Sequence, residues 1–305
     1  MNREHWIRAL RVAGIVLAIS FLVHSLVAAG RELNTFSGEV SWLRVGVAVL
    51  VLTGTYLGFA WLWRRIAQDL GTRVAYVHAV QLWAFSNLGR YLPGKIWQVV
   101  GLVVVAKDLG VSGALAASVA IVALGFTIAT GSLLAAICLP GYVLGHPWLI
   151  GFALASLVAL AVPLLWPGAV RWSLSRFAFS RDAADAVHLS HRDTARLAAS
   201  FALMWLSHGL TFMLLVSAVV SVDWSRYTEY AGVFSLSYVA GVIAIFAPGG
   251  IGVRESALAH VMQAQQLHPE SANIIAILAR IWTVLGEVLM VVIAVFVRRR
   301  SSGRL

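Results

Sequence analysis

The sequence predicts an all-α polytopic membrane protein that forms a single transmembrane domain over residues 1–305. The chain is 60% hydrophobic and only 12% charged, with a mean hydropathy of +0.85, whereas soluble domains carry about 25% charged residues. Segments of about 20 apolar residues are long enough to cross the hydrocarbon core as helices. We predict about six such spans, at 12–29, 42–63, 113–138, 147–167, 197–220 and 273–297.

The first of these spans has features of a cleavable leader, because Arg3, Arg8 and Arg11 precede its apolar stretch. The stretch is longer than the apolar core of a typical signal peptide, and no clear cleavage site follows it. We therefore expect residues 12–29 to be retained as a transmembrane helix.

Two further apolar regions, 75–110 and 228–265, are interrupted by helix-breaking residues. Proline lacks an N–H group and glycine is a weak helix former, so both interruptions should end helices. The arms beside them are too short, at 1.5 Å per residue, for most to cross the membrane. We predict two re-entrant helical hairpins, with kinked pairs of short spans as the alternative. The predicted breaks are Pro93 and Gly94 in the first region, and Pro248, Gly249, Gly250 and Gly252 in the second.

The basic residues are distributed unevenly between the two predicted membrane faces. If both interrupted regions begin and end on one side, most of the 23 basic residues share a face, and the opposite face keeps only Arg31, Arg44 and Arg226. Basic loops mark the cytoplasmic side of a membrane. We expect a multi-pass protein of the bacterial inner membrane with both termini in the cytoplasm. This reading accounts for most of the net charge of +10 without nucleic acid as a partner.

The longest polar stretch, 168–196, should be a cytoplasmic loop that begins with an interfacial amphipathic helix. It contains Asp185, His188 and His191, which we interpret as a solvated face and not as a metal site. The single cysteine, Cys138, excludes an intramolecular disulfide and a cysteine-based metal centre. We expect no cofactor and no metal.

A small set of charged residues remains at membrane depth after the loops are assigned. Each costs about 2.5–3.5 kcal/mol on insertion scales, so these side chains should face a shared interior. The assigned topology brings the two breaks to mid-membrane from opposite sides, and paired interrupted segments indicate a transporter's binding site. Inverted symmetry stays a hypothesis, because no residue-level repeat relates the two halves. The charged residues at depth are Arg90, Lys95, Arg254, Arg280, Glu255 and Glu287.

The breaks combine new helix N-termini with basic side chains, a chemistry that attracts phosphate. The alternative for Arg90 and Lys95 is that they extend from a short amphipathic pair towards water. We expect Glu255 and Glu287 to act in charge pairing or gating, with Glu287 balancing Arg254 or Arg280 or exchanging a proton. The predicted ligands of a lipid phosphate and headgroup are Asn87, Arg90, Tyr91, Lys95, Gln98, Arg254 and Arg280.

The same two clusters carry a resemblance to a known family. The chain resembles the flippase-like membrane family named after the transmembrane region of lysylphosphatidylglycerol synthases, which includes proteins linked to archaeal dolichol-phosphate sugars and to bacterial hopanoids. The resemblance implies a bundle with two re-entrant elements and a role in lipid translocation. The synthases add a cytosolic aminoacyl-transfer domain, which we expect to be absent here, since the chain ends shortly after the last span. The matching residues are Gly89-Arg90-Tyr91-Leu92-Pro93-Gly94-Lys95 and Pro248-Gly249-Gly250-Ile251-Gly252-Val253-Arg254-Glu255.

These observations predict a lipid flippase that is not an enzyme and has no ATPase motif. Its substrate would be an anionic lipid, either a polyprenyl-phosphate-linked glycan or a modified phospholipid. One alternative is a membrane glycosyltransferase with a lipid-phosphate donor. Another is a non-transporting partner subunit of a lipid-modifying enzyme. The sequence leaves the identity of the lipid and the oligomeric state open.

Overall fold

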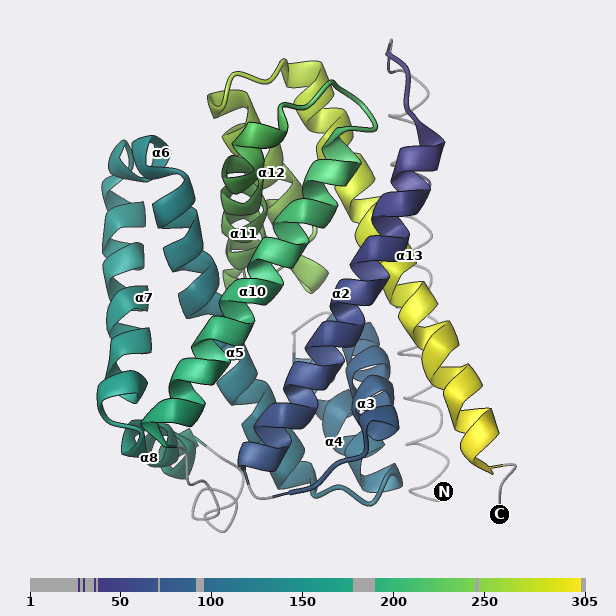
Figure 1. Cartoon of the computed structure of the whole chain (residues 1–305), viewed down its shortest axis with the longest axis vertical. Coiled ribbons are helices and arrows are strands. Elements are labelled where there is room, and N and C mark those ends of the chain that lie inside the picture. Colours follow the sequence, from purple (N-terminus) through teal and green to yellow (C-terminus); the bar gives the residue numbers. More distant parts are fainter. Residues whose placement is uncertain are drawn as a thin grey trace, which may run out of the picture.

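The computed structural model of the chain describes residues 27, 30, 36, 38–70, 72–91, 96–177, 190–244 and 247–302. Every regular element among these residues is a helix, which confirms the all-α prediction. The predicted first span lies outside the described residues, apart from Val27. The long helices run beside one another and form an elongated bundle (Figure 1).

Five of the described helices are long and apolar enough to cross a membrane. Each coincides with one of the predicted spans, although α2, α10 and α13 extend further. These extensions carry polar ends, such as Arg64 and Arg65 on α2, that continue the helix beyond the apolar stretch. The five are α2 (Trp42–Asp69), α5 (Gly113–Cys138), α7 (Pro147–Leu165), α10 (His191–Val216) and α13 (Pro269–Ser302).

The start of α10 shows why the helix begins earlier than the apolar pattern suggests. The Ser190 side chain accepts a hydrogen bond from the Asp193 N–H at 3.2 Å, and the Asp193 carboxylate accepts one from the Ser190 N–H at 3.2 Å. This reciprocal cap satisfies two backbone donors that the first turn would otherwise leave unpaired. The cap therefore fixes the helix start in a polar stretch of sequence.

The two interrupted regions each form a pair of short helices, as predicted. The first pair is α3 (Tyr76–Leu88) and α4 (Ile96–Asp108), with η1 (Gly89–Tyr91) after α3; residues 92–95, including Pro93, Gly94 and Lys95, lie outside the described residues. The second pair is α11 (Tyr227–Ile243) and α12 (Val253–Ala264), with η3 (Pro248–Gly250) between them. At 1.5 Å per residue, these four helices are about 18–25 Å long, which is shorter than the roughly 30 Å hydrocarbon core.

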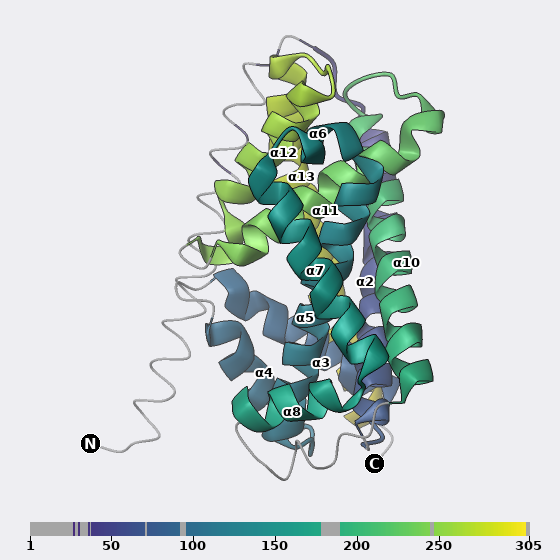
Figure 2. The same ribbon diagram turned by 90° about the vertical axis from the view of Figure 1, so that its left-hand side faces the viewer.

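The two pairs occupy opposite halves of the bundle. Figures 1 and 2 both show α3 and α4 at one end, and α11 and α12 at the other. Their interruptions meet in the middle, where η1 contacts η3. α13 runs the length of the bundle and packs against both α3 and α12, so a single helix reaches both breaks.

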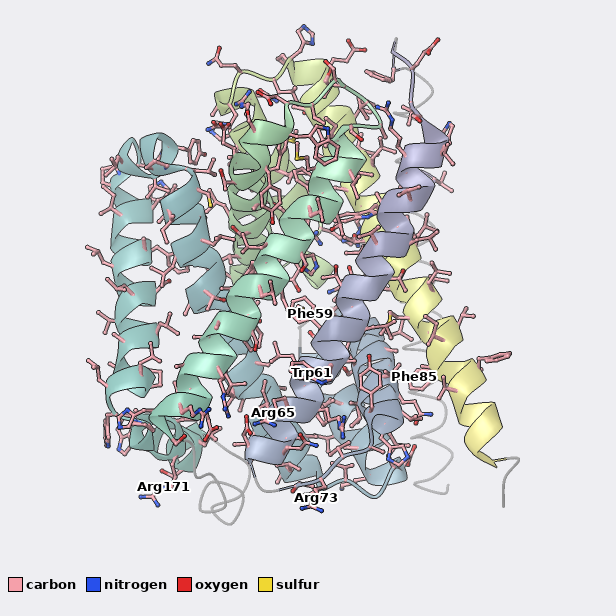
Figure 3. All side chains as sticks on the ribbon, in the orientation of Figure 1. Phe59, Trp61, Arg65, Arg73, Phe85 and Arg171 are labelled. Atoms are coloured by element: carbon pink, nitrogen blue, oxygen red, sulfur yellow. The ribbon has the colours of Figure 1, made fainter. Side chains whose placement is uncertain are left out.

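Several basic residues of the described connections lie together at one end of the bundle. Arg65, Arg73 and Arg171 lie at the end of the bundle where α2 and α7 finish (Figure 3). This end also carries α8 (Gly168–Phe177), which opens the predicted polar loop; residues 178–189 lie outside the described residues. The opposite end carries α6 (Pro140–Leu144) and η2 (Trp224–Arg226), where Arg226 pairs with Glu229 at 2.5 Å.

Apolar packing forms two buried clusters, one in each half of the bundle. Around α11 and α13 the cluster includes Phe212, Phe234 and Trp282, and the indole N–H of Trp282 donates to the Ala48 carbonyl at 2.9 Å. The other cluster surrounds the C-terminal part of α2 and includes Leu62. A rigid scaffold therefore encloses the region where the two breaks meet.

The second break requires glycine at a close backbone contact. Gly249, Gly250 and Gly252 have φ values of 60°, 75° and 80°, in a region that other residues rarely adopt. A Cβ on Gly250 would also lie 2.9 Å from the Gly241 Cα. These glycines let the turn pack directly against α11.

Candidate functional site

The breaks and α13 gather five charged residues into one buried cluster, as the argument from insertion cost predicts. The cluster consists of Arg90 from η1, Arg254 and Glu255 from α12, and Arg280 and Glu287 from α13. Arg254, Arg280 and Glu287 are only 8%, 6% and 3% exposed. Lys95, the sixth charge at depth, lies outside the described residues.

Glu287 is paired with the first break. Its carboxylate forms an ion pair with the Arg90 guanidinium and accepts a hydrogen bond from the Tyr91 hydroxyl at 2.6 Å. The sequence analysis assigned Arg254 or Arg280 as its partner, and the structure corrects that assignment. The reason is geometric: the Arg90 and Tyr91 side chains of η1 reach Glu287, whereas Arg280 lies two turns away from it on the same helix, about 10 Å along the axis.

Tyr91 joins the two breaks to α13. The guanidinium carbons of Arg90 and Arg280 lie 5.5 Å and 5.2 Å from the centroid of its ring. A Cβ on Gly249 would lie 3.3 Å from the same ring. Tyr91 is 4% exposed, so its role is to pack between the charged groups, and it does not line the cavity described below.

Arg280 and Glu255 connect α13 to the second break. The Arg280 Nη1 atom lies 3.7 Å from a Glu255 carboxylate oxygen. The other Glu255 oxygen accepts a hydrogen bond from the Gly252 N–H at 2.7 Å, which caps the start of α12. A carboxylate in the first turn also complements the positive end of the helix dipole. Glu255 is therefore engaged twice and holds the turn in place.

Arg254 differs from the other two arginines because no carboxylate among the described residues pairs with it. Its guanidinium carbon lies 5.0 Å from the ring centroids of Phe234 and Tyr238. Its Nη2 atom is buried and has no hydrogen-bond partner within the described part of the chain. A buried donor without a partner costs free energy, more so when it is charged. Arg254 is thus the residue of the cluster best placed to take an external anion.

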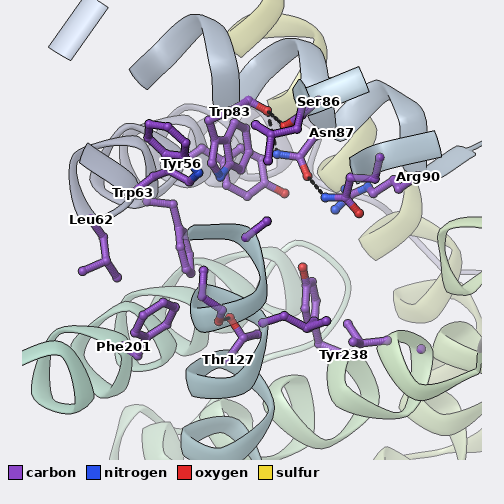
Figure 4. Close-up of a pocket in the computed structure, with 18 of the residues that line it drawn as sticks. Tyr56, Leu62, Trp63, Trp83, Ser86, Asn87, Arg90, Thr127, Phe201 and Tyr238 are labelled. Carbon is purple, nitrogen blue, oxygen red and sulfur yellow. Dashed lines mark hydrogen bonds between the residues drawn. The ribbon is translucent and has the colours of Figure 1, made fainter. Parts of the chain in front are cut away.

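A cavity of about 330 Å³ lies directly beside this cluster. Its polar end is lined by Arg90 and Arg254 with Asn87 and Gln98, and the Gln98 amide donates to the Asn87 side-chain oxygen at 3.1 Å. Figure 4 shows Asn87 and Arg90 on one side, with the Tyr238 hydroxyl pointing towards them from the other. Helix α12 begins at this end of the cavity. Its helix dipole and the two arginine side chains therefore both favour an anion here.

The opposite end of the cavity is apolar. Leu62 and Phe201 line it (Figure 4), and Leu102, Ile121 and Leu124 add further apolar side chains to the cavity wall. Ile121 and Leu124 are also 37% and 49% exposed, so the part of the wall that α5 forms lies at the molecular surface. A molecule with a charged head and apolar tails would find matching surroundings at both ends.

Aromatic residues that the sequence analysis did not single out form much of the wall. Tyr56, Trp83 and Tyr238 come from three different helices, and His208 from a fourth. His208 is buried, stacks on Phe234 with ring centroids 5.2 Å apart and places its Nδ1 atom 3.1 Å from the Met204 carbonyl oxygen. His208 is therefore packed as a buried polar residue, and it also lines the cavity.

The structure thus divides the predicted site residues into two groups. The first group does not line the cavity and consists of Tyr91, Gly252, Glu255, Arg280 and Glu287. The side chain of Pro248 lies outside the described part of the structure. Within the described ranges, no three His, Cys, Asp or Glu side chains come together as metal ligands would. The predicted residues that line the cavity are Asn87, Arg90, Gln98, Gly249, Gly250 and Arg254.

Comparison with known protein families agrees with the resemblance carried by the two motifs. Residues 7–290 match the lysylphosphatidylglycerol synthase TM region family, so the match covers nearly the whole chain and both breaks. A search of curated proteins returned no match to the chain. The chain therefore belongs to the lysylphosphatidylglycerol synthase TM region family, a family of lipid-related, often flippase-like membrane domains, and is a multi-pass membrane protein.

Proposed function

We propose that this protein is a flippase that moves an anionic lipid across the inner membrane, and that it does so without enzymatic chemistry. The observation that carries the proposal is Arg254, a buried arginine that lines the cavity with one nitrogen lacking a partner among the described residues. A lipid phosphate offers the oxygen acceptors that this guanidinium lacks. The substrate would be a polyprenyl-phosphate-linked glycan or a modified phospholipid.

The charge balance of the cluster supports an anionic substrate. Arg90 is neutralised by Glu287, and Arg280 lies beside Glu255. Arg280 also has nitrogens without partners among the described residues, but it does not line the cavity. The positive charge left over therefore belongs to Arg254. A charge at membrane depth is expensive, so an uncompensated one indicates a functional role.

The shape of the cavity supports a lipid and not a soluble anion. Its polar end holds the arginines, and its apolar wall includes Ile121 and Leu124, which lie at the molecular surface. In our proposal the headgroup occupies the polar end while the acyl or prenyl tails extend past α5 into the bilayer. The headgroup then passes between the two breaks, which approach each other from opposite halves of the bundle.

The proposed orientation follows the distribution of charge. The end that carries Arg65, Arg73 and Arg171 would face the cytoplasm, since basic loops are retained there. α3 and α4 then form a re-entrant pair from the cytoplasmic side, and α11 and α12 one from the outside. Both chain termini would be cytoplasmic.

The direct test is lipid scrambling in proteoliposomes with a membrane-impermeant quencher and tail-labelled fluorescent probes of both proposed classes, a prenyl-phosphate hexose and a headgroup-modified anionic phospholipid. The wild-type protein should expose the inner-leaflet pool to the quencher, and Arg254→Gln should slow this at least ten-fold. Arg226→Gln is the matched control, because Arg226 lies in an exposed pair with Glu229, away from the cavity. Equal rates in Arg254→Gln and wild type, or no scrambling above protein-free vesicles, would refute the proposal.

A further inference from the structure

The cavity wall also contains residues that would contact the part of the lipid headgroup beyond the phosphate. None of the described residues that line the cavity is acidic. In the sequence, residues 92–95 and 245–246, which complete the two breaks, also contain no Asp or Glu. The Glu287 carboxylate is paired with Arg90 and Tyr91, and neither it nor Glu255 lines the cavity.

This absence matters because the cavity already contains two guanidinium groups. An ammonium group placed beside Arg90 and Arg254 would have like charges nearby and no carboxylate to pair with. Buried charges are retained only when they are paired, so a cationic headgroup is disfavoured here. The aromatic faces nearest the arginine pair do not compensate, since Phe234 and Tyr238 are already covered by the Arg254 guanidinium.

The neutral polar groups of the wall suit a hydroxylated headgroup. Tyr56 and Tyr238 both line the cavity, and each carries a phenol hydroxyl. Ser86 and Thr127 add two more hydroxyls, and Asn87 and Gln98 add side-chain amides. Groups of this kind donate to and accept from alcohols without a charge.

The rings of the wall add a surface for a polyol ring. Trp83, Tyr56 and Trp205 line the cavity, and Trp83 packs on Tyr56 with ring centroids 4.7 Å apart. An aromatic face is apolar and carries partial negative charge, which favours the C–H face of a sugar or inositol ring. The volume of about 330 Å³ is near the lower end of small-molecule sites, so it accommodates one small ring and not a long glycan.

We infer that the cavity selects lipids with a phosphodiester linked to an uncharged, ring-shaped polyol, and rejects headgroups that carry an ammonium group. This inference rests on the proposed function, since it assumes that Arg254 binds the lipid phosphate. Two kinds of lipid carry a headgroup of this chemistry: a prenyl-phosphate sugar and a glycerophospholipid with a cyclic polyol.

Competition binding to the full chain in detergent, read by native mass spectrometry, tests the inference. The probes are dioctanoyl phosphatidylinositol, farnesyl-phosphate hexose, dioctanoyl phosphatidic acid and dioctanoyl lysyl-phosphatidylglycerol. We expect phosphatidylinositol to be bound at least ten-fold over lysyl-phosphatidylglycerol, and the farnesyl arm shows whether the site prefers prenyl or diacyl tails. Equal or stronger binding of lysyl-phosphatidylglycerol overturns the inference. If all four lipids bind equally through Arg254, the inference fails and the proposed function stands; if none binds in an Arg254-dependent way, both fail.

Two substitutions probe the wall itself. Gln98→Glu would place a carboxylate in the cavity, and should reduce the preference for phosphatidylinositol over lysyl-phosphatidylglycerol at least ten-fold. Tyr238→Phe should reduce the preference for phosphatidylinositol over phosphatidic acid about five-fold, the effect of one neutral hydrogen bond. An unchanged headgroup preference in both variants would contradict the assignment of this wall as the selective surface.

Discussion

The two breaks contain similar residues, but their arginines have different partners. In the first break, Arg90 is paired with Glu287, which also accepts a hydrogen bond from Tyr91. In the second break, Arg254 has aromatic rings beside it and no acid partner among the described residues. The difference indicates that the first arginine chiefly holds the structure together, whereas the second is available to a ligand.

α13 accounts for part of this asymmetry. It offers an acid to the first break through Glu287 and a base to the second through Arg280. The Glu255 carboxylate pairs with Arg280 and accepts a hydrogen bond from the Gly252 N–H, so it does not pair with Arg254. The four predictions that follow test this comparison, from the largest expected effect to the smallest.

Removing the acid of the first break should produce the largest loss of stability. Glu287→Ala leaves Arg90 buried without a counter-charge, which typically costs about 3–5 kcal/mol of the free energy of unfolding. Thermal unfolding in detergent would measure this as a lower midpoint. The double variant Arg90→Gln with Glu287→Gln should recover part of the loss, because both charges are then gone. A Glu287→Ala protein as stable as wild type would show that the pair is not structural.

The glycine contact of the second break should come next. Gly250→Ala places a Cβ 2.9 Å from the Gly241 Cα and forces alanine to a φ of 75°. Left-handed backbone costs about 1–2 kcal/mol and overpacking about 1–3 kcal/mol, so a loss of about 2–4 kcal/mol is expected. Gly252→Ala is the matched control, since its φ is 80° but no atom lies within 4 Å of the added Cβ. Equal unfolding midpoints for the two variants would argue against the close contact.

Removing the arginine of the second break should affect transport and leave stability nearly intact. Arg254→Gln should reduce lipid scrambling at least ten-fold, equivalent to about 1.4 kcal/mol. Its unfolding midpoint should stay close to that of wild type, because no acid is left unpaired. If Arg254→Gln were instead as unstable as Glu287→Ala, the distinction between the two breaks would be lost.

The remaining ion pair should have the smallest effect. The Arg280 and Glu255 atoms lie 3.7 Å apart, and the Glu255 side chain is 22% exposed, so solvent weakens their attraction. Glu255→Gln should cost about 1 kcal/mol of the free energy of unfolding, much of it from the weaker cap on the Gly252 N–H. A loss comparable with that of Glu287→Ala, measured in the same thermal assay, would contradict this ranking.

Much of the fold could be predicted because lipid imposes strong constraints on sequence. The five described long helices appear as apolar runs, and both breaks appear where Pro93, Gly94 and Pro248 end such runs. The ends of α2 and α10 were placed less well, since their first and last turns are polar and the caps are set by single residues such as Ser190.

The site was only partly predictable, for a physical reason. Charged residues at membrane depth stand out, so Arg90, Arg254 and Glu287 could be identified from the sequence. Their pairing depends on how η1, α12 and α13 meet, which no local pattern encodes. Helices that are apolar on every side do not reveal which face is buried. The wall residues Tyr56 and Tyr238 were missed for that reason.

The measurement that tests the central claim most directly is the count of tightly bound lipid on delipidated protein, by native mass spectrometry, in wild type and single-arginine variants. Binding at the unpaired arginine predicts one retained anionic lipid in wild type and in Arg226→Gln, and its loss in Arg254→Gln. Retention of that lipid in Arg254→Gln, or its absence from the wild-type protein, would contradict the account.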